Sequence, residues 1–262
     1  MNSPRIAEVK LERDCSIDKF YIGYNKYSRG DIVIVETEHG KEVGFVLDTF
    51  ELKERKRYKR VLKRVEEKEL EKYKKKRKRE IEDFPKVKKI IEDAGLDMKL
   101  IKINYTFDNK KLFIYYTSEG RVDFRELLKV LAREFKRRIQ MVQIGVRDET
   151  KIVGGIGVCG RILCCSSFLR KFESIVVDFI KIQNLSANVE KLMGVCGRLM
   201  CCLYYEVEMY KELLKGIPSI GEEIETPEGR GKVIEIRPFM NEVRVKFEND
   251  TYKVFSFDEV RK

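Results

Sequence analysis

Hydrophobic and polar residues alternate near both ends of the chain, the pattern of β-strands with one buried face. Near the N-terminus the alternation runs through DIVIVET (Asp31–Thr37) and KEVGFVLD (Lys41–Asp48), with a turn at EHG between them. Near the C-terminus, residues 221–257 contain a strand, a Pro-Glu-Gly turn and three more alternating runs. We therefore expect a small antiparallel β module in residues 1–52 and another in residues 217–262. Both are similar in pattern to SH3-like folds, which says little about function.

Residues 53–94 follow a helical pattern in which apolar residues are few. The apolar positions form one narrow stripe among Lys, Arg and Glu: Leu70, Tyr73, Ile81 and Phe84. A stripe this thin can seat a helix on a neighbour but cannot build a domain. We therefore predict a basic helical arm, which Pro85 breaks or kinks, with Asp83 capping a second helical piece.

Residues 95–216 mix both patterns. MKLIKINYTFD and KKLFIYYTS predict a hairpin around Asp108–Lys110, and VDFRELLKVLAREFKRR predicts an amphipathic helix followed by the strand IQMVQIGV. Asp123 and Glu126 have the spacing of a capping box at the start of that helix, and a last helix is expected through Lys215. The fold class predicted is α+β: a central domain with helices on one face of a sheet, flanked by the two β modules and the basic arm.

The composition indicates a cytosolic protein. The chain has 262 residues, its N-terminal stretch is too polar for a signal peptide, and no run of about 18 apolar residues predicts a membrane span. Thiols stay reduced in the cytosol, so clustered cysteines there point to metal or redox chemistry rather than to disulfides.

The formal net charge of +11 comes from one segment. Lys53–Arg79 contains sixteen Lys and Arg against five Glu, and the remaining basic and acidic residues cancel. A helix this basic could neutralise phosphates of RNA or DNA without reading sequence. Charged helices are also often solvated faces or docking arms for partners, so direct nucleic-acid binding is the alternative function to the one reached below.

Six of the seven cysteines lie in two nearly identical segments, GVCGRILCC (Gly157–Cys165) and GVCGRLMCC (Gly194–Cys202). Each offers Cys-Gly-Arg-x-x-Cys-Cys, and a soft metal ion or cluster needs several thiolates that converge from short loops. Arg161 and Arg198 could lower the pKa of the thiols or donate hydrogen bonds to cluster sulfurs. The alternative is that the cysteines are small core residues. Because the CxxC spacing usual for zinc is absent, six thiols favour an iron–sulfur cluster, and we expect the two segments to share one site.

The sequence gives little support for nucleotide binding or for catalysis. The GxGxxG match at Gly155–Gly160 lacks a clear βαβ setting and is a weak dinucleotide signal. His39 is the only histidine and is expected at the surface, which leaves no Cys-His nucleophile pair. Asp148 and Glu149 fit a helix N-terminus. Adjacent cysteines with apolar flanks also argue against a thiol redox enzyme, so we expect no enzymatic activity.

The paired CGRxxCC motifs, together with VDFRE, IGVRDE and QNLS between Gly95 and Glu206, resemble the YaaT family of bacteria, also called RicT. Val158 departs from the pattern, because a proline is expected before that cysteine. The resemblance implies a non-enzymatic regulatory subunit that joins two small helical partners, YlbF and YmcA, in a complex carrying [4Fe–4S] clusters. It further implies that the complex directs RNase Y in messenger RNA maturation and so affects sporulation, biofilm formation and competence.

The same resemblance supplies candidate ligands by position. They are Cys159, Cys164, Cys165, Cys196, Cys201 and Cys202. The resemblance leaves open which of these six bind and whether a partner chain supplies further ligands. Cys15 lies outside both motifs.

Overall fold

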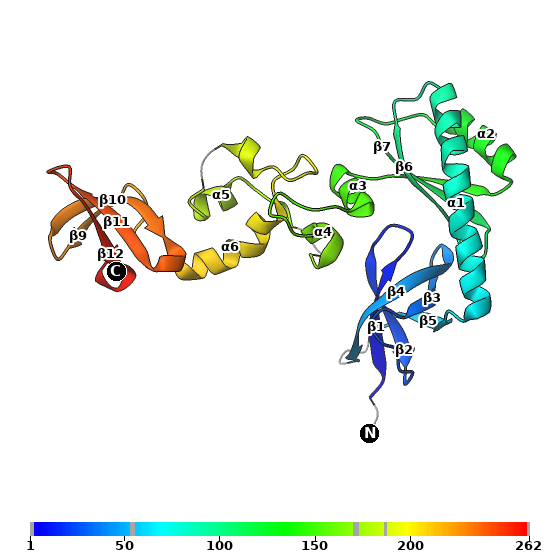
Figure 1. Cartoon of the computed structure of the whole chain (residues 1–262), viewed down its shortest axis with the longest axis horizontal. Helices are drawn as coiled ribbons and strands as arrows, with labels where there is room; N and C mark the ends of the chain where they lie inside the picture. The colour runs from blue at the N-terminus through cyan, green and yellow to red at the C-terminus, as the bar shows by residue number, and fades with distance from the viewer. Residues whose placement is uncertain (1–2, 53–55, 170–172, 186–187, 261–262) are drawn as a thin grey trace. The chain divides into compact units, whose positions relative to one another are not determined.

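The structure of the protein is a computed structural model that describes residues 3–52, 56–169, 173–185 and 188–260. The chain divides into two compact units, Met1–Arg170 and Lys171–Lys262. Both contain helices and β-sheets (Figure 1). The α+β class expected from the sequence is therefore confirmed.

The first unit begins with a closed β-barrel in the strand order β1-β2-β5-β3-β4. Its strands are β1 (Arg5–Leu11), β2 (Ile17–Gly23), β3 (Ile32–Thr37), β4 (Gly40–Glu51) and β5 (Lys59–Arg64). The predicted hairpin is confirmed as β3 and β4, which pair antiparallel. Alternate side chains point inward and form the core: Ala7, Val9, Leu11, Phe20, Ile22, Val33, Val35, Val46 and Val61. The alternation seen in the sequence is therefore the inside and outside of a barrel.

Strand β5 lies within the segment for which the sequence predicts a helical arm. It pairs antiparallel with β3 and parallel with β2, and so closes the barrel. Val61 is its buried side chain, whereas the residues around it are exposed. A single buried position gives no periodicity that could reveal a strand. The N-terminal module thus extends to residue 64, beyond the expected boundary at residue 52.

Helix α1 (Glu67–Asp93) is continuous through Pro85, which corrects the predicted break and second helical piece. Proline removes the hydrogen bond to the carbonyl four residues earlier, that of Ile81. The Ile81 side chain is 70% exposed, so this carbonyl lies on the side of the helix that water reaches. Phe84 and Val87 pack on the neighbouring sheet on either side of the proline and keep the helix in place.

The central sheet has the order β6-β7-β8, with β6 (Lys99–Tyr105) and β7 (Lys111–Thr117) antiparallel and β8 (Arg138–Gln143) parallel to β7. Helix α2 (Arg125–Phe135) connects β7 to β8. Helices α1 and α2 cover one face of this sheet, as predicted. The buried side chains between them are Val87, Ile91, Ile103, Tyr105, Leu112, Ile114, Leu127, Leu131 and Phe135.

The predicted capping box at α2 is wrong. The helix begins at Arg125 with Phe124 as its N-cap residue. Asp123 lies one position too early and forms an ion pair with Arg125 at 2.6 Å, while Glu126 pairs with Lys129. Helix α3 (Val146–Val153) does carry Asp148 and Glu149 in its first turn, as expected, and α4 (Cys164–Ser167) ends the unit.

The second unit joins short helices to a four-stranded antiparallel sheet of order β12-β11-β10-β9. Its elements are α5 (Asp178–Ile182), η1 (Val189–Leu192), α6 (Cys201–Leu213), β9 (Glu223–Thr226), β10 (Gly229–Arg237), η2 (Pro238–Met240), β11 (Glu242–Phe247), β12 (Tyr252–Ser256) and α7 (Phe257–Val260). The sheet core includes Val233, Val243 and Val245, and Leu214 and Ile217, which follow α6, pack against it.

The hairpins β3–β4 and β9–β10 share one arrangement of backbone contacts. In each, a glycine before the first strand donates to a valine carbonyl of the second strand, and that valine donates to the residue after the glycine. The contacts are Gly30 N to Val46 O (2.8 Å) and Val46 N to Asp31 O (2.9 Å), and Gly221 N to Val233 O (2.8 Å) and Val233 N to Glu222 O (2.9 Å). Gly44 faces Val33 in the first hairpin, and Gly231 faces Ile224 in the second.

Gly44 supports a first prediction. A Cβ at this position would lie 2.3 Å from Val9 Cγ1 and 3.2 Å from the Lys10 carbonyl oxygen. We expect Gly44→Ala to lower the free energy of unfolding by about 1–3 kcal/mol, because the added methyl group overpacks the barrel. Urea unfolding measures the loss. Gly120→Ala is the matched control, since a Cβ there meets nothing within 4 Å. Equal stability of the two variants would contradict the prediction.

Candidate functional site: two cysteine motifs

The first cysteine motif folds as a tight hairpin that leads into a helix. Ile156 and Ile162 form an antiparallel bridge. Gly157 donates to the Arg161 carbonyl at 2.8 Å, and Gly160 donates to the Gly157 carbonyl at 2.9 Å. Gly160 has φ +74°, the left-handed residue that a three-residue hairpin loop requires. Cys159 therefore stands at the tip of the loop.

The second motif repeats this backbone in the other unit. Met193 and Leu199 form the bridge, and the corresponding hydrogen bonds are Gly194 N to Arg198 O (2.8 Å) and Gly197 N to Gly194 O (2.9 Å). Gly197 has φ +69°. The remaining two cysteines of each motif open a helix, Cys164 and Cys165 in α4 and Cys201 and Cys202 in α6. The two nine-residue motifs thus adopt the same conformation in two different places of the fold. This conformation is therefore determined by the local sequence.

The thiols differ in exposure. Cys159 is exposed, Cys165 is buried at 7% exposure, and the others are half-buried: Cys164, Cys196, Cys201 and Cys202. Arg161 and Arg198 are exposed. A Cβ on Gly157 would lie 3.5 Å from the Cys159 sulfur, and one on Gly194 would lie 3.9 Å from the Cys196 sulfur. The first glycine of each motif therefore leaves room for the tip cysteine to fold back over its own loop.

The thiols of one motif do not by themselves fit a metal ion or a [4Fe–4S] cluster. Within the residues that the structure describes, no three Cys, His, Asp or Glu side chains are grouped so as to hold a metal. A cluster needs four ligands in most proteins, so a single motif with three thiols would require sulfur from elsewhere. The two motifs belong to different units, and their convergence on one site stays a prediction.

Large apolar side chains of these motifs face solvent. In the first motif Val158 is 75% exposed and Ile162 67%, and Ile156 directly before the motif is 66% exposed. In the second motif Val195 is 58% exposed. Exposed apolar residues that gather in one place indicate a surface that another protein covers. Each cysteine motif therefore combines three cysteines with exposed apolar side chains.

Each motif is anchored within its own unit. Lys10 of β1 donates from Nζ to the Ser166 carbonyl at 3.2 Å, which ties α4 to the barrel. In the second unit the buried Gln183 side chain donates to the Leu203 carbonyl at 2.6 Å and holds the start of α6 against α5.

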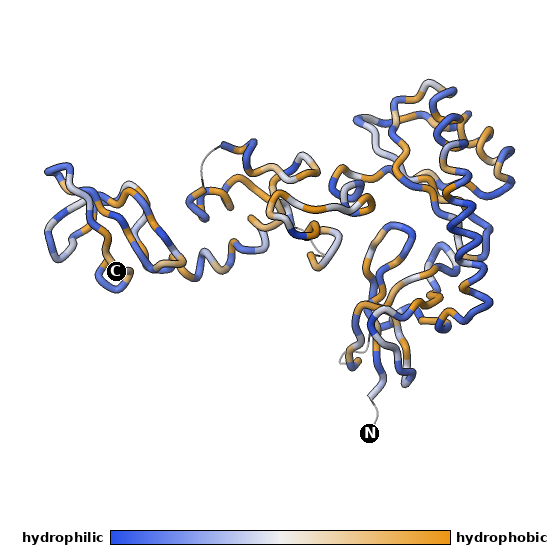
Figure 2. Tube along the Cα trace, viewed as in Figure 1, coloured by the Kyte–Doolittle hydropathy of each residue, from blue (hydrophilic) through white to orange (hydrophobic). Residues whose placement is uncertain are grey.

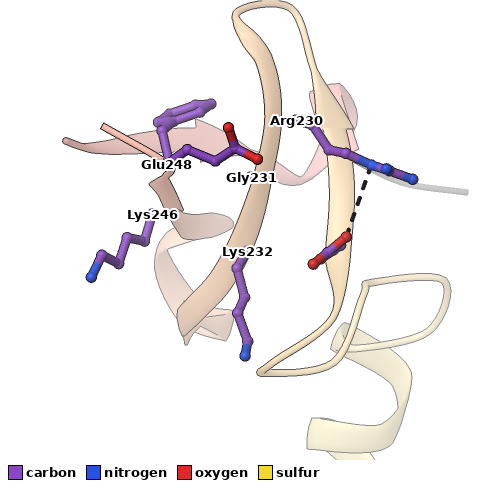
Figure 3. Close-up of a pocket in the computed structure, with 7 residues that line it drawn as sticks. Arg230, Gly231, Lys232, Lys246 and Glu248 are labelled. Atoms are coloured by element: carbon purple, nitrogen blue, oxygen red, sulfur yellow. Dashed lines mark ion pairs between the residues drawn. The ribbon is translucent and has the colours of Figure 1, made fainter. Parts of the chain in front are cut away.

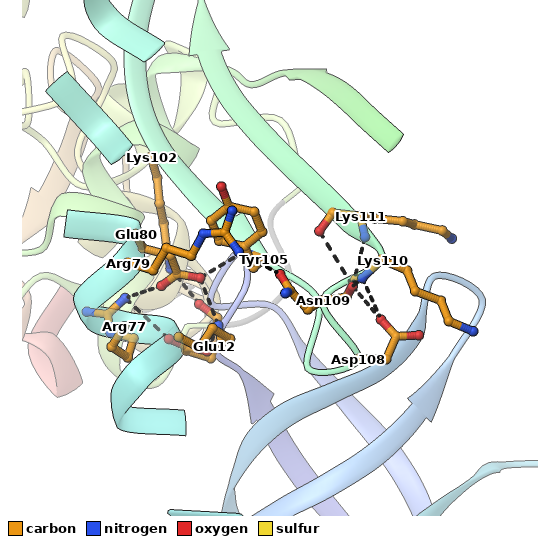
Figure 4. A network of polar contacts seen from close by, with 12 residues as sticks. Glu12, Arg77, Arg79, Glu80, Lys102, Tyr105, Asp108, Asn109, Lys110 and Lys111 are labelled. Carbon is orange, nitrogen blue, oxygen red and sulfur yellow. Dashed lines mark hydrogen bonds and ion pairs between the residues drawn. The ribbon is translucent and has the colours of Figure 1, made fainter. Parts of the chain in front are cut away.

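Part of the basic segment is neutralised by a polar network rather than free. Glu80 of α1 is 4% exposed, and its carboxylate accepts hydrogen bonds from Lys76 at 2.9 Å, from Arg77 at 3.2 Å and from the Tyr105 backbone N–H at 2.8 Å (Figure 4). Lys76 and Arg77 also pair with Glu12 of the loop after β1. This network joins the barrel, α1 and β6.

Burial in the network changes proton affinities. Lys102 donates to the Glu12 carbonyl, and burial lowers the pKa of its ammonium group. Burial, with Glu12 nearby, raises the pKa of Tyr73 to about 12. Figure 2 shows α1 as a largely hydrophilic segment, yet its charged side chains serve in part as internal links. Sequence reasoning missed this role because Glu12 lies far from the helix in the chain, although the spacing of Lys76 and Glu80 was a local signal.

His39 differs from the expected surface residue. Its ring packs edge-on against Phe113 at 5.2 Å, and its side chain is 25% exposed. Burial and the nearby Arg13 lower the pKa of His39. It lies between the barrel and the second face of the central sheet, and so serves packing.

A shallow cavity of about 220 Å³ lies on the C-terminal sheet (Figure 3). Its charged lining residues are Glu223, Arg230, Lys232, Lys246 and Glu248. Acidic and basic groups nearly balance there, and Arg230 is already within 3.9 Å of Glu223. This arrangement does not indicate a particular ligand.

None of the helices described has the length and apolar character needed to cross a bilayer.

Two family models match the chain. The PSP1 C-terminal conserved region matches residues 59–144, which span β5, α1 and the central sheet, and the third domain of PSP1-like proteins matches residues 174–217, which contain the second cysteine motif. No solved structure matches the chain.

Curated relatives agree with these models. The stage 0 sporulation protein YaaT of Bacillus subtilis is 55% identical over 147 residues, which are 56% of this chain and 53% of YaaT. An uncharacterized protein of Schizosaccharomyces pombe is 30% identical over 86 residues (33% of this chain, 12% of that protein), and Protein PSP1 of Saccharomyces cerevisiae is 43% identical over 49 residues (19% and 6%). The chain thus spans about half the length of YaaT and smaller parts of the other two. The 55% identity to YaaT over about half of the chain, together with the two PSP1 regions, supports membership of the YaaT family.

Proposed function

We propose that the protein is a non-enzymatic regulatory subunit, an adaptor that acts in the cytoplasm within an iron–sulfur-containing protein complex. By family likeness its partners are YlbF-like and YmcA-like helical proteins, and the complex directs RNase Y in messenger RNA processing. The name of its Bacillus relative supports a role related to sporulation. Effects on biofilm formation and competence, and the SH3-like character of the two end modules, belong to the same proposal.

The observation that carries the proposal is the repeated cysteine motif. Two segments in different units fold into the same hairpin and helix start, and both present thiols beside exposed apolar side chains. Packing alone does not require a Cys-Gly-Arg turn twice, whereas ligands of a shared metal site do need a fixed presentation. The exposed Val158 and Ile162 fit contact with a partner chain.

The six candidate ligands would be shared rather than used within one motif. Since three thiols of one motif do not group to hold a metal in the described part of the chain, the remaining ligands would come from the other motif or from a partner. When bound, a [4Fe–4S] cluster would supply a redox- and oxygen-sensitive link between chains. Zinc is the alternative ion, held by four of the thiols.

The test is anaerobic purification of the full chain, alone and co-expressed with YlbF-like and YmcA-like partners. We expect iron and acid-labile sulfide to accompany the complex, with zinc absent, and the partners to co-elute with the chain. A stable complex free of iron and sulfide would overturn the cluster. A chain that binds neither partner would overturn the adaptor role.

Direct nucleic-acid binding is the second candidate, favoured by one face of α1. Lys68, Lys72 and Lys75 recur at helical spacing, are exposed, and have no ion-pair partner among the described residues. Neutralising phosphates with such a row gives salt-dependent, sequence-independent affinity.

Replacing these three lysines with Gln should weaken RNA binding and reduce the slope of log K against log salt by about 0.7 per lost contact with a single strand. Gel shifts at several salt concentrations measure it. The matched control replaces Lys74, Lys78 and Lys88, which pair with Glu71, Glu82 and Glu92 on the same helix. An equal slope for both triple variants would refute binding through this face.

A further inference from the structure

The two equivalent hairpins differ in what lies beside their first strand. In the N-terminal barrel, β3 has β4 on one side and β5 on the other. In the C-terminal sheet, β9 has β10 on one side, and no strand of the described chain pairs with its other side. Helix α7 contacts β9 through the sheet core, where Phe257 and Val260 pack with Ile224. An unpaired edge presents backbone donors and acceptors that can pair with a further strand.

The backbone contacts show which residues face this edge. Val233 donates to the Glu222 carbonyl, so Glu222 points toward β10. Along an antiparallel strand the backbone groups point alternately to the two sides. Glu223 and Glu225 therefore direct their N–H and C=O groups toward the open edge.

In the N-terminal barrel, a strand occupies the edge that corresponds to the outer edge of β9. Because Gly44 and Gly231 are equivalent, Ile32 of β3 corresponds to Glu223 of β9. The Ile32 carbonyl accepts a hydrogen bond from the Val65 backbone N–H, directly after β5, at 2.8 Å. Val33 and Ile34 continue this pairing with Arg64 and Lys63. The outer edge of the β3–β4 hairpin thus accommodates an antiparallel strand, and the β9–β10 hairpin has the same backbone arrangement.

Charge at the open edge selects the kind of strand. Four carboxylates lie on β9 or next to it: Glu222, Glu223, Glu225 and Glu228. Two of them already face a basic side chain, since Glu223 lies 3.9 Å from Arg230 and Glu228 pairs with Lys253. In the barrel, Arg64 of the closing strand reaches Asp31, whose carboxylate also accepts the Ser28 N–H. Glu222 holds the corresponding place and accepts the Ser219 N–H at 2.9 Å. A basic residue of an incoming strand would meet a carboxylate in both hairpins.

From this correspondence we propose that the β9 edge binds an extended, basic segment of a partner protein. The segment adds as an antiparallel strand, as β5 does in the N-terminal barrel. Backbone hydrogen bonds to Glu223 and Glu225 supply affinity, and Lys or Arg side chains opposite the acidic edge supply preference.

The probe is a fluorescent synthetic peptide with the sequence of residues 57–65, RYKRVLKRV, titrated into the full chain and followed by anisotropy. The backbone N–H of Val65 points toward β3, and so does that of Lys63, because backbone groups alternate along a strand. The N–H groups of Leu62 and Arg64 point away from β3. N-methylation of Lys63 and Val65 should weaken binding by about tenfold or more. N-methylation of Leu62 and Arg64 is the matched control with equal charge and should have a smaller effect.

On the protein side, Glu225→Pro removes one outward N–H and leaves the β9–β10 ladder intact, since proline is tolerated on edge strands. We expect binding to fall by about tenfold, with an unchanged circular dichroism spectrum. Replacing Glu223 and Glu225 with Lys should reduce it similarly through charge. Equal binding of the two methylated peptides would overturn the proposal even if the proline variant unfolds, because it would show attraction by charge alone. Unchanged binding by a folded Glu225→Pro would overturn it as well.

Discussion

Joint replacement of the two tip cysteines, Cys159→Ser with Cys196→Ser, is expected to abolish iron and sulfide incorporation into the complex. The two residues hold equivalent places, each just before the left-handed glycine of its hairpin. Serine preserves size but is a poor ligand for iron, because soft thiolates are what these clusters bind. If both motifs serve one site, each single variant should already lower the iron content strongly and to a similar degree.

Cys15→Ser is the control, since Cys15 lies outside both motifs and should leave iron and sulfide unchanged. Both tip cysteines stand in loops, so their replacement should change the stability of the apoprotein little. Circular dichroism of the metal-free chain checks this. Iron content that survives the double replacement would contradict the assignment. Loss from only one single variant would show that the motifs do not act together.

Glu80→Ala should destabilise the first unit by about 3–5 kcal/mol, the usual effect of removing one member of a buried ion pair. The truncation leaves Lys76, at 10% side-chain exposure, with Glu12 alone, and removes the acceptor of the buried Tyr105 N–H. The substitution therefore leaves the Lys76 ammonium group with one ion-pair partner fewer and the buried Tyr105 N–H without its acceptor. Chemical unfolding followed by circular dichroism measures the change.

Glu82→Ala is the matched control on the same helix. Glu82 is 58% exposed and lies 3.8 Å from Lys78, so its loss should change stability by at most about 0.5 kcal/mol. Glu80→Gln, which keeps an acceptor for Tyr105 but removes the charge, should fall between the two. A Glu80→Ala variant as stable as Glu82→Ala would refute the linking role of the network.

The parts of the fold that follow from sequence are those in which one periodicity decides. Alternation in residues 31–48 predicts the β3–β4 hairpin, and the strand, strand, helix, strand order of the central sheet follows in the same way. Strand β5 escapes because Val61 alone is buried in it. Pro85 misleads because tertiary packing of Phe84 and Val87 overrides a local helix-breaking preference.

The candidate site shows the same division. Seven identical positions in nine predicted that the two cysteine motifs are alike, and both indeed form one hairpin with one glycine geometry. The burial of Glu80 did not follow from its spacing to Lys76, because that spacing also fits a surface ion pair and a glutamate on a basic helix usually faces water. Its inward position depends on Glu12 and Tyr105, which only the folded chain brings to it.

The place of β5 in the barrel also bears on synthesis. Residues 5–51 supply four of the five barrel strands. The fifth strand, β5, lies between β2 and β3 in the barrel and ends at residue 64. While β5 is still inside the ribosome, the four strands that have emerged form an incomplete barrel. The edge of β3 at Val33–Val35, which β5 later covers, is then exposed. The barrel can therefore close only after residue 64 has left the ribosome, and a nascent chain arrested before that point would expose a strand edge prone to self-association.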